Sequence, residues 1–412
     1  MTTAPTTRTA PPAAPKSRPT MPLTVYVLGL GIFAMVTSEL QVSGLMPVMA
    51  RGLDVPIPQI GYLISYYAFA MAVGGPLLAV ALLRLRHKSG LMVLFALFVL
   101  GEALAAASPG YAVMVLARIV TGAVSGAFFG VALAVCVEVA DEKLRGRATS
   151  LVLGGLMVGT VLGLPGANLI GQHWGWRASF WTVTALTAVV GLITAATVPA
   201  LEKQEARSLR EETAELKRPR LWAVFSTSTL VIGATYAAFS YFTPILKQVT
   251  GFGDGTVPLL LIAYGVATVI GNNVVGRLAD RHTLPVLTAG LIALTAFLTL
   301  FGLLADQPVP AVVALLGTGL VGVTMNPALV TRVMRTANGR PLVNTVHTSM
   351  ITMGVVIGSW AGGLGIGAGY GLRAPLWVGA TLAVLGFLSL LPDLITARRI
   401  RRATDPAATT GP

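Results

Sequence analysis

The sequence predicts an all-α protein that crosses a membrane twelve times, as two pseudo-symmetric halves of six helices each. Of the 412 residues, 54% are hydrophobic and only 11% are charged, whereas soluble proteins have about 25% charged residues. Long apolar segments recur from residue 23 to residue 395, and each has the roughly 20 residues that a helix needs to cross ~30 Å of hydrocarbon. These segments are continuous, whereas the strands of a membrane barrel alternate apolar and polar residues over about 10 positions.

Twelve apolar segments account for the two halves and define the rest of the chain. Residues 23–200 form the first half and residues 221–395 the second, and residues 201–220, the most charged stretch, are expected to form a solvated cytoplasmic linker. Residues 1–22 are rich in Thr, Ala and Pro and predict a disordered cytoplasmic tail, and residues 396–412 predict a second tail. The expected helices are 23–46, 59–83, 90–107, 111–137, 148–171, 176–198, 221–246, 256–279, 284–304, 309–331, 342–368 and 374–395.

The positions of Lys and Arg predict that both termini lie in the cytoplasm. If the N-terminus is internal, 24 of the 29 basic residues fall in internal segments and 4 in external loops, so that only Arg118 lies inside a helix. Internal loops of membrane proteins carry this excess of positive charge. The asymmetry explains the net charge of +13 without nucleic acid. We therefore expect a multi-pass protein of the cytoplasmic membrane, in contact with the lipid bilayer and with no nucleic-acid partner.

The helix expected at 148–171 carries a stripe of small residues. They are spaced four apart along one face: Gly155, Gly159, Gly163, Ala167 and Gly171. Small residues at this spacing let a second helix approach closely in a membrane. Pro165 removes a backbone donor and should bend the helix. We expect this helix to form the interface across which the two halves move.

Acidic side chains are rare in the apolar segments, where a charge costs roughly 2.5–3.5 kcal/mol even on a lenient insertion scale. Glu39 lies near the middle of the first expected helix, and Glu102 lies late in the third, nearer a membrane face. Burial favours the neutral form of a carboxyl, and an acid that exchanges a proton suits a proton-coupled carrier. Glu39 is therefore expected to bind the proton or a cationic solute, or else to form a structural hydrogen bond. Glu102 is expected either to face a cavity or to extend toward the headgroups.

Arg118 begins a second stripe, with Gly122, Gly126 and Gly130 following it on one helix face. A guanidinium keeps its charge at any accessible pH, and the glycines let a neighbouring helix approach it. We expect a fixed positive charge in a proton relay or at a cavity wall, with an anchor to phosphate headgroups as the alternative. Weaker candidates for cavity residues are Asn272, Asn273, Asn326 and His347.

The sequence contains none of the enzyme signatures HExxH or GxSxG, no phosphate-binding glycine loop and no cysteine pair, since Cys136 is its one cysteine. We therefore expect no enzymatic activity, no metal and no cofactor. Transport would then be driven by an ion gradient.

Related loop sequences follow the second helix of each half. GRLADRH occupies 276–282 and ALLRLRHK occupies 81–88, with Leu83 where the second copy has Asp280. Parallel repeats of six helices predict a binding site at mid-membrane between the halves.

Four sequence patterns, spread over about residues 22–395, resemble the major facilitator superfamily, and in particular its twelve-span drug:proton antiporters. Residues 37–47, TSELQVSGLMP, resemble the helix-1 pattern of an acid before G-L-L-P. GWRASFW, VTGFG and GNNVVGRLADR suggest the branch of chloramphenicol, arabinose and purine-ribonucleoside exporters. The other matching residues are Arg118 and Gly122 in the helix-4 motif, Gly159, Gly163, Pro165 and Gly166 in the helix-5 antiporter motif, and Gly276, Leu278, Ala279, Asp280 and Arg281 in the loop motif G-x-L-A-D-R.

The resemblance implies proton-coupled efflux of a small, fairly hydrophobic solute, such as a drug or antibiotic, by alternating access. It assigns proton coupling to Glu39 and Arg118 and a latch between the halves to the loop motif. The partners would be protons and the solute, and we expect a monomer. Two alternatives remain: a sugar or nucleoside transporter, by export or by proton symport, and, more remotely, a membrane sensor that transports nothing. The chain departs from the family pattern at Leu83 and at Glu102, where an uncharged polar residue is expected.

Overall fold

The computed structural model describes residues 21–82, 84–199, 216, 218–336 and 341–404, with side chains for all of these except 280, 341, 342 and 397–404. Within these ranges it contains twelve helical spans that are long and apolar enough to cross a membrane. The predicted fold class is therefore confirmed. The division of the chain into five segments stays a prediction, because most of the linker and much of both tails lie outside the described residues.

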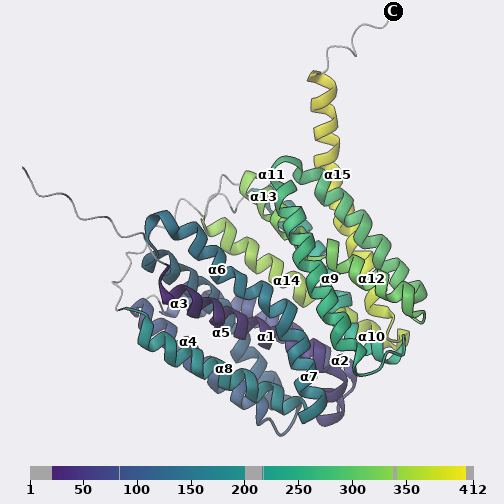
Figure 1. The fold of residues 1–412 in the computed structure, drawn as a ribbon. Coiled ribbons are helices and arrows are strands. Elements are labelled where there is room, and N and C mark those ends of the chain that lie inside the picture. The colour runs from purple at the N-terminus through teal and green to yellow at the C-terminus, as the bar shows by residue number, and fades with distance from the viewer. Residues whose placement is uncertain (1–20, 83, 200–215, 217, 337–340, 405–412) are drawn as a thin grey trace, which may run out of the picture.

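Six spans form the N-terminal half, coloured purple to teal in Figure 1. Four of them are single helices, one contains the π turn η1, and one contains the short 3₁₀ turn η2 and the π turn η3. The elements in order are α1 (Leu23–Gly52), α2 (Ile57–Phe69), η1 (Ala70–Gly74), α3 (Gly75–Leu82), α4 (His87–Ala106), α5 (Tyr111–Val139), η2 (Glu142–Leu144), α6 (Arg145–Val158), η3 (Gly159–Gly163), α7 (Leu164–Trp174) and α8 (Trp176–Thr197).

The other six spans form the C-terminal half, coloured green to yellow in Figure 1. The elements in order are α9 (Pro219–Phe239), α10 (Phe242–Gln248), α11 (Thr256–Leu304), α12 (Pro308–Val321), η5 (Val323–Met325), α13 (Asn326–Thr336), α14 (Pro341–Gly365), η6 (Ile366–Tyr370) and α15 (Ala374–Thr404).

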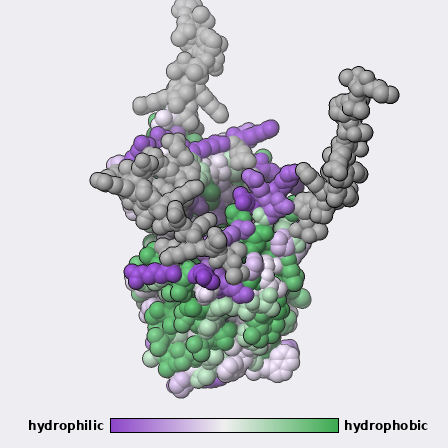
Figure 2. Space-filling model, turned by 90° about the vertical axis from the view of Figure 1, so that its left-hand side faces the viewer, coloured by the Kyte–Doolittle hydropathy of each residue, from purple (hydrophilic) through white to green (hydrophobic). Residues whose placement is uncertain are grey.

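The two halves lie side by side, and the chain enters and leaves them at one end. Because the number of spans is even, α1 begins on the same face of the bundle on which α15 ends; we call this the terminal face, and the other the opposite face. Figure 2 shows hydrophobic side chains over the main body of the molecule and hydrophilic ones toward one end. This distribution is the one expected of a helical bundle surrounded by lipid.

Two seams join the halves. At one, α2 and η1 lie against α14, and at the other, η3 and α7 lie against α11. At each seam, the span from the N-terminal half contains a π turn that ends two residues before a proline. The turn η1 precedes Pro76, and η3 precedes Pro165. A proline has no N–H and its ring crowds the carbonyl four residues earlier, and a π turn relieves this crowding. The disruption predicted at Pro165 takes this form.

The helix that carries the glycine stripe lies at a seam between the halves, as predicted, but the stripe itself packs inside the N-terminal half. A Cβ added at Gly155 would lie 2.1 Å from the carbonyl oxygen of Gly29 on α1, and one at Gly159 would lie 2.8 Å from Val36. The seam with α11 uses a different face of the helix, where Gly265 meets Val161. Spacing alone predicted close packing correctly but could not identify the partner, because every face of a membrane helix can pack.

The second copy of the loop motif lies at a kink in α11. The range Thr256–Leu304 joins two helices across this kink, where the backbone of His282 leaves helical geometry with φ −131° and ψ 41°, and it contains two of the twelve spans, Thr256–Ala279 and Arg281–Leu304. Gly276 has open space where a Cβ would lie, and Arg281 is exposed. The side chain of Asp280 and all of Leu83 lie outside the described residues, so the predicted latch stays a prediction.

Candidate functional site

A cavity of about 570 Å³ lies between the halves. On α14 its lining runs from Asn344 to Val355, the part of that helix nearer the terminal face, and on α1 it begins at mid-helix, at Val36. The cavity therefore extends from the middle of the bundle toward the terminal face. Its position matches the mid-membrane site predicted from the internal repeat.

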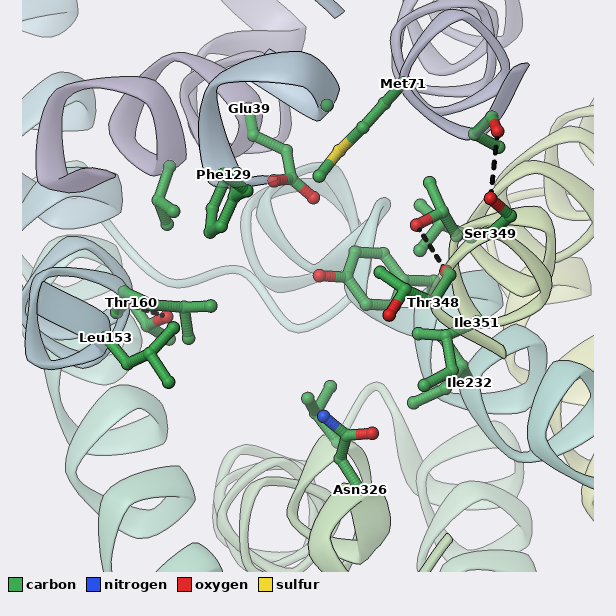
Figure 3. Close-up of a pocket in the computed structure, with 18 of the residues that line it drawn as sticks. Glu39, Met71, Phe129, Leu153, Thr160, Ile232, Asn326, Thr348, Ser349 and Ile351 are labelled. Atoms are coloured by element: carbon green, nitrogen blue, oxygen red, sulfur yellow. Dashed lines mark hydrogen bonds between the residues drawn. The ribbon is translucent and has the colours of Figure 1, made fainter. Parts of the chain in front are cut away.

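The N-terminal half supplies an almost entirely apolar wall, which in Figure 3 carries Glu39, Met71, Phe129, Leu153 and Thr160. Glu39 is the one charged residue among the described residues that line the cavity. The remaining lining residues of this half are Val36, Leu40, Ala72, Pro76, Gly126, Gly130, Leu133, Leu156 and Met157.

The C-terminal half supplies the polar but uncharged groups of the cavity. Five of them lie on α14, where Asn344, Thr345, Thr348, Ser349 and Thr352 line the space. These positions repeat at four-residue intervals along α14, so they form one face. The pattern is visible in the sequence NTVHTSMIT, and it is the signal that sequence reasoning missed. Other polar lining groups of this half are Tyr236, Tyr264, Thr268, Asn272, Thr324 and Asn326.

The halves contact each other closely on the side of the cavity toward the opposite face. Ser65 on α2 and Ser359 on α14 are hydrogen-bonded, with their Oγ atoms 2.7 Å apart. The Tyr241 hydroxyl donates to the backbone oxygen of Ser359 over 2.9 Å, and its ring lies against Gly61, where a side chain would collide with it. These contacts close that end, so the cavity lies on the side of them that faces the terminal face.

A further contact crosses the halves nearer the cavity. Ser349 of α14 donates to the backbone oxygen of Ala72 over 3.1 Å. Ala72 lies four residues before Pro76, so its carbonyl has no proline N–H to bond. The hydroxyl of the other half thus satisfies a carbonyl that the proline leaves free.

Glu39 lies on α1, and its carboxyl points into the open space of the cavity (Figure 3). It forms no side-chain hydrogen bond or ion pair with any described residue. Its neighbour on the polypeptide, Ser38, is fully buried and points into the N-terminal half. Two adjacent residues of α1 thus face different environments: Glu39 faces the cavity, and Ser38 faces the interior of the N-terminal half.

Arg118 on α5 is fully buried within the N-terminal half. Its Nη1 donates to the backbone oxygen of Ser38 over 2.9 Å and to Ser38 Oγ over 3.2 Å, and its Nη2 donates to the backbone oxygen of Glu39 over 3.4 Å. The guanidinium lies 4.1 Å from the ring centroid of Tyr67. Helix α2 can approach this closely only because residue 122 is a glycine. A Cβ at Gly122 would lie 2.2 Å from the Tyr67 carbonyl oxygen. Arg118 is therefore an interior charge and not a headgroup anchor.

Glu102 on α4 is also fully buried, and it neither lines the cavity nor reaches a membrane face. Ser38 Oγ donates to its Oε1 over 2.5 Å, and Gln41 Nε2 donates to its Oε2 over 3.2 Å. Ser179 on α8 in turn donates to Gln41 Oε1 over 3.1 Å. The sequence suggested that Glu102 lies near a membrane face, because the position of a residue along a helix does not reveal which neighbouring side chains enclose it.

Of the four weaker candidates, two line the cavity and two do not. Asn272 and Asn326 line the cavity, and Asn326 Oδ1 is buried without a hydrogen-bond partner. Asn273 is exposed and bonds to the backbone of its own helix, so it is not a cavity residue. His347 is not one either, because it is fully buried beside Phe225, with its Nε2 2.8 Å from Ser228 Oγ.

Comparison with known proteins gives consistent results. A family model described as Major Facilitator Superfamily matches residues 27–341. The chain is 33% identical to a chloramphenicol resistance protein of Streptomyces lividans, over 90% of this chain and 96% of that protein. It is also 33% identical to the inner membrane transport protein YdhP of Escherichia coli, over 88% and 94% of the two chains. Among solved structures, a partially occluded inward-open xylose transporter, XylE from E. coli, superposes with a TM-score of 0.69 at 16% identity, over 90% of this chain and 96% of that one.

Proposed function

Because the chain belongs to the major facilitator superfamily and is a multi-pass membrane transporter rather than an enzyme, we propose that it exchanges protons for a small, fairly hydrophobic solute. Export would proceed by alternating access, driven by the proton gradient without a cofactor. The solute and protons are the proposed partners, and a monomer suffices because one chain forms the whole cavity.

The observation that carries this proposal is the acid in the cavity, which is the one charged group among the described lining residues. Glu39 lies on an apolar wall with its carboxyl directed into the space that a solute would occupy. Low polarity favours a protonated carboxyl, and access from the cavity allows the proton to leave. A proton and a solute that compete for this position would be transported in opposite directions.

The direction of transport follows from orientation. The excess of Lys and Arg in the segments at the terminal face supports placing both termini in the cytoplasm of the cell. The state described here would then accept solute from the cytoplasm, as an exporter requires. In the opposite state, external protons would reach Glu39 and displace the solute outward.

Cavity chemistry supports an amphiphilic solute. An apolar wall faces a wall of hydroxyls and amides, and the unpaired Asn326 Oδ1 can accept a hydrogen bond from a solute. No basic side chain lines the cavity among the described residues, which disfavours anions. A neutral or singly cationic drug fits this description, in agreement with the name of the chloramphenicol resistance relative.

The test compares wild type with Glu39→Gln in proteoliposomes with an imposed pH gradient, with chloramphenicol as the first of a panel of drugs. We expect wild type to transport against the solute gradient and the variant to lose pH-driven efflux. Glu142→Gln, at an exposed acid on η2, is the matched control and should behave as wild type. If Glu39→Gln retained full pH-driven efflux, the proposal would fail.

The hydroxyl-rich face of α14 also favours a second candidate, the transport of a sugar or nucleoside. Imposed pH gradients of either sign distinguish the two functions. Uptake that follows the proton inward would establish symport, whereas movement of solute against the proton would establish antiport.

A further inference from the structure

We propose that Glu102 is the fixed counter-anion of Arg118, and that it leaves Glu39 free to gain and lose the proton. This inference rests on the proposed function, in which Glu39 carries the proton. It begins from the cost of burial: the Arg118 side chain is 0% exposed, and a buried charge needs an opposite charge nearby. Two acids, Glu39 and Glu102, are close enough to interact with it electrostatically.

Ser38 connects Arg118 to Glu102. Arg118 Nη1 donates to Ser38 Oγ over 3.2 Å, and Ser38 Oγ donates to Glu102 Oε1 over 2.5 Å. A serine has one hydroxyl proton. The oxygen accepts a bond from the guanidinium, and its proton is directed at the carboxyl of Glu102. Ser38 Oγ thus links the guanidinium of Arg118 to the carboxyl of Glu102 through two hydrogen bonds.

The second carboxyl oxygen of Glu102 also faces a donor. Gln41 Nε2 donates to Oε2 over 3.2 Å, and the Gln41 amide is held in this orientation by Ser179, which donates to its Oε1 over 3.1 Å. Each oxygen of Glu102 thus accepts a hydrogen bond, which is the arrangement that suits an ionised carboxylate.

Glu39 has the opposite surroundings. Its carboxyl has no described hydrogen-bond partner and lines the cavity. The charged and titratable groups that interact with it are Arg118 on α5, Tyr67 on α2 and Tyr236 on α9.

With Arg118 balanced by Glu102, protonation of Glu39 leaves the region without net charge. The two acids thus differ in function: Glu102 stays ionised, and Glu39 exchanges a proton. Glu102 is in this sense a positioning residue, because it acts on the proton site through Arg118.

The test is an infrared titration of protonated carboxyl groups in the full-length chain in lipid nanodiscs, without solute. Wild type should show a protonated-carboxyl band that titrates and that Glu39→Gln removes. In Glu102→Gln the band should remain, but its midpoint should fall by about one to three pH units, because Glu39 becomes the only anion near Arg118. A purely structural role of Glu102 would not move this midpoint. The proposal is overturned if Glu102→Gln removes a protonated-carboxyl band or leaves the Glu39 midpoint unchanged.

Glu102→Gln preserves the size of the side chain, and Gln41 can turn its amide over to pair with the new one, because the Ser179 hydroxyl can accept as well as donate. If the variant nevertheless fails to fold, Ser38→Ala is the variant that tests the proposal. It keeps Glu102 but removes the connecting hydroxyl, so a smaller fall of the midpoint is expected, and an unmoved midpoint overturns the proposal.

The two proposals fail separately. If the titrating band survives in Glu39→Gln, Glu39 is not the proton site and the proposed function fails. The state of Glu102 is still measured by adding Glu102→Gln to that variant: no protonated-carboxyl band disappears if Glu102 is ionised, and one disappears if it is neutral.

Discussion

Arg118 is the residue on which the polar interior of the N-terminal half depends. It bonds to the backbone at Ser38 and Glu39, and its guanidinium lies over the ring of Tyr67. Tyr67 in turn shares a hydrogen bond with Ser125, with the two oxygens 2.5 Å apart. A single guanidinium thus joins α1, α2 and α5. Lysine could not replace it, because an ammonium has neither the planar fork nor the same ability to stack on a ring.

At the residue scale we expect the charges of Arg118 and Glu102 to be energetically coupled. Arg118→Met should cost about 3–5 kcal/mol of the free energy of unfolding, because it leaves a buried carboxylate without its counter-charge. Adding Glu102→Gln to Arg118→Met should recover part of that loss. The measurement is a double-mutant cycle, followed by titration from a mild into a denaturing detergent. Strictly additive costs would show that the two side chains are independent.

At the scale of elements, the glycine stripe determines how closely α6 and α7 lie against α1. Gly155 faces the Gly29 carbonyl, whereas its neighbour Gly154 is half-buried and has open space around a Cβ. The two positions share a helix, a residue type and a local sequence, and they differ only in the face that they occupy. They therefore form a matched pair.

We expect Gly155→Ala to lower the thermal midpoint of unfolding, because its Cβ would lie 2.1 Å from a backbone oxygen that cannot rotate away. Gly154→Ala should leave the midpoint unchanged or raise it, since alanine favours a helix over glycine by about 1 kcal/mol. Thermal unfolding in detergent measures both variants. Equal effects of the two substitutions would contradict the packing of this stripe on α1.

At the scale of the whole molecule, the contacts near the opposite face hold the halves in one of the two states that alternating access requires. Ser65 and Ser359 meet there from different halves, with their oxygens 2.7 Å apart. They must separate for the cavity to open on that side. A covalent bond between these positions would therefore prevent the second state.

We expect Ser65→Cys combined with Ser359→Cys, in a Cys136→Ser background, to form a disulfide under oxidation, since disulfides need side chains this close. Turnover in proteoliposomes should then fall to the level without protein and return on reduction. Each single-cysteine variant is the control and should transport in both conditions. Unchanged turnover in the oxidised double variant, with the disulfide verified by gel mobility, would show that these contacts do not open during transport.

Much of the architecture was predictable because it depends on composition and on local spacing. Apolar segment length determines where a helix can span a bilayer, and the twelve predicted segments correspond to the twelve spans. The isolation of Glu39 in an apolar helix marked it as a candidate, and it lines the cavity. The close approach predicted beside Arg118 is present as the packing of α2 on Gly122.

What only the tertiary structure decided is which faces meet. Spacing predicts a stripe but not its neighbour: the helix lies at a seam as predicted, but its stripe packs on α1. Depth in a helix does not reveal enclosure, so Glu102 proved to be interior rather than near a face or in the cavity. Hydrogen-bond direction also exists only in three dimensions, because Ser38, Gln41 and Glu102 come from two helices. The sequence by itself thus determined the spans and the rare charges within them, whereas packing decided which of those charges faces the cavity.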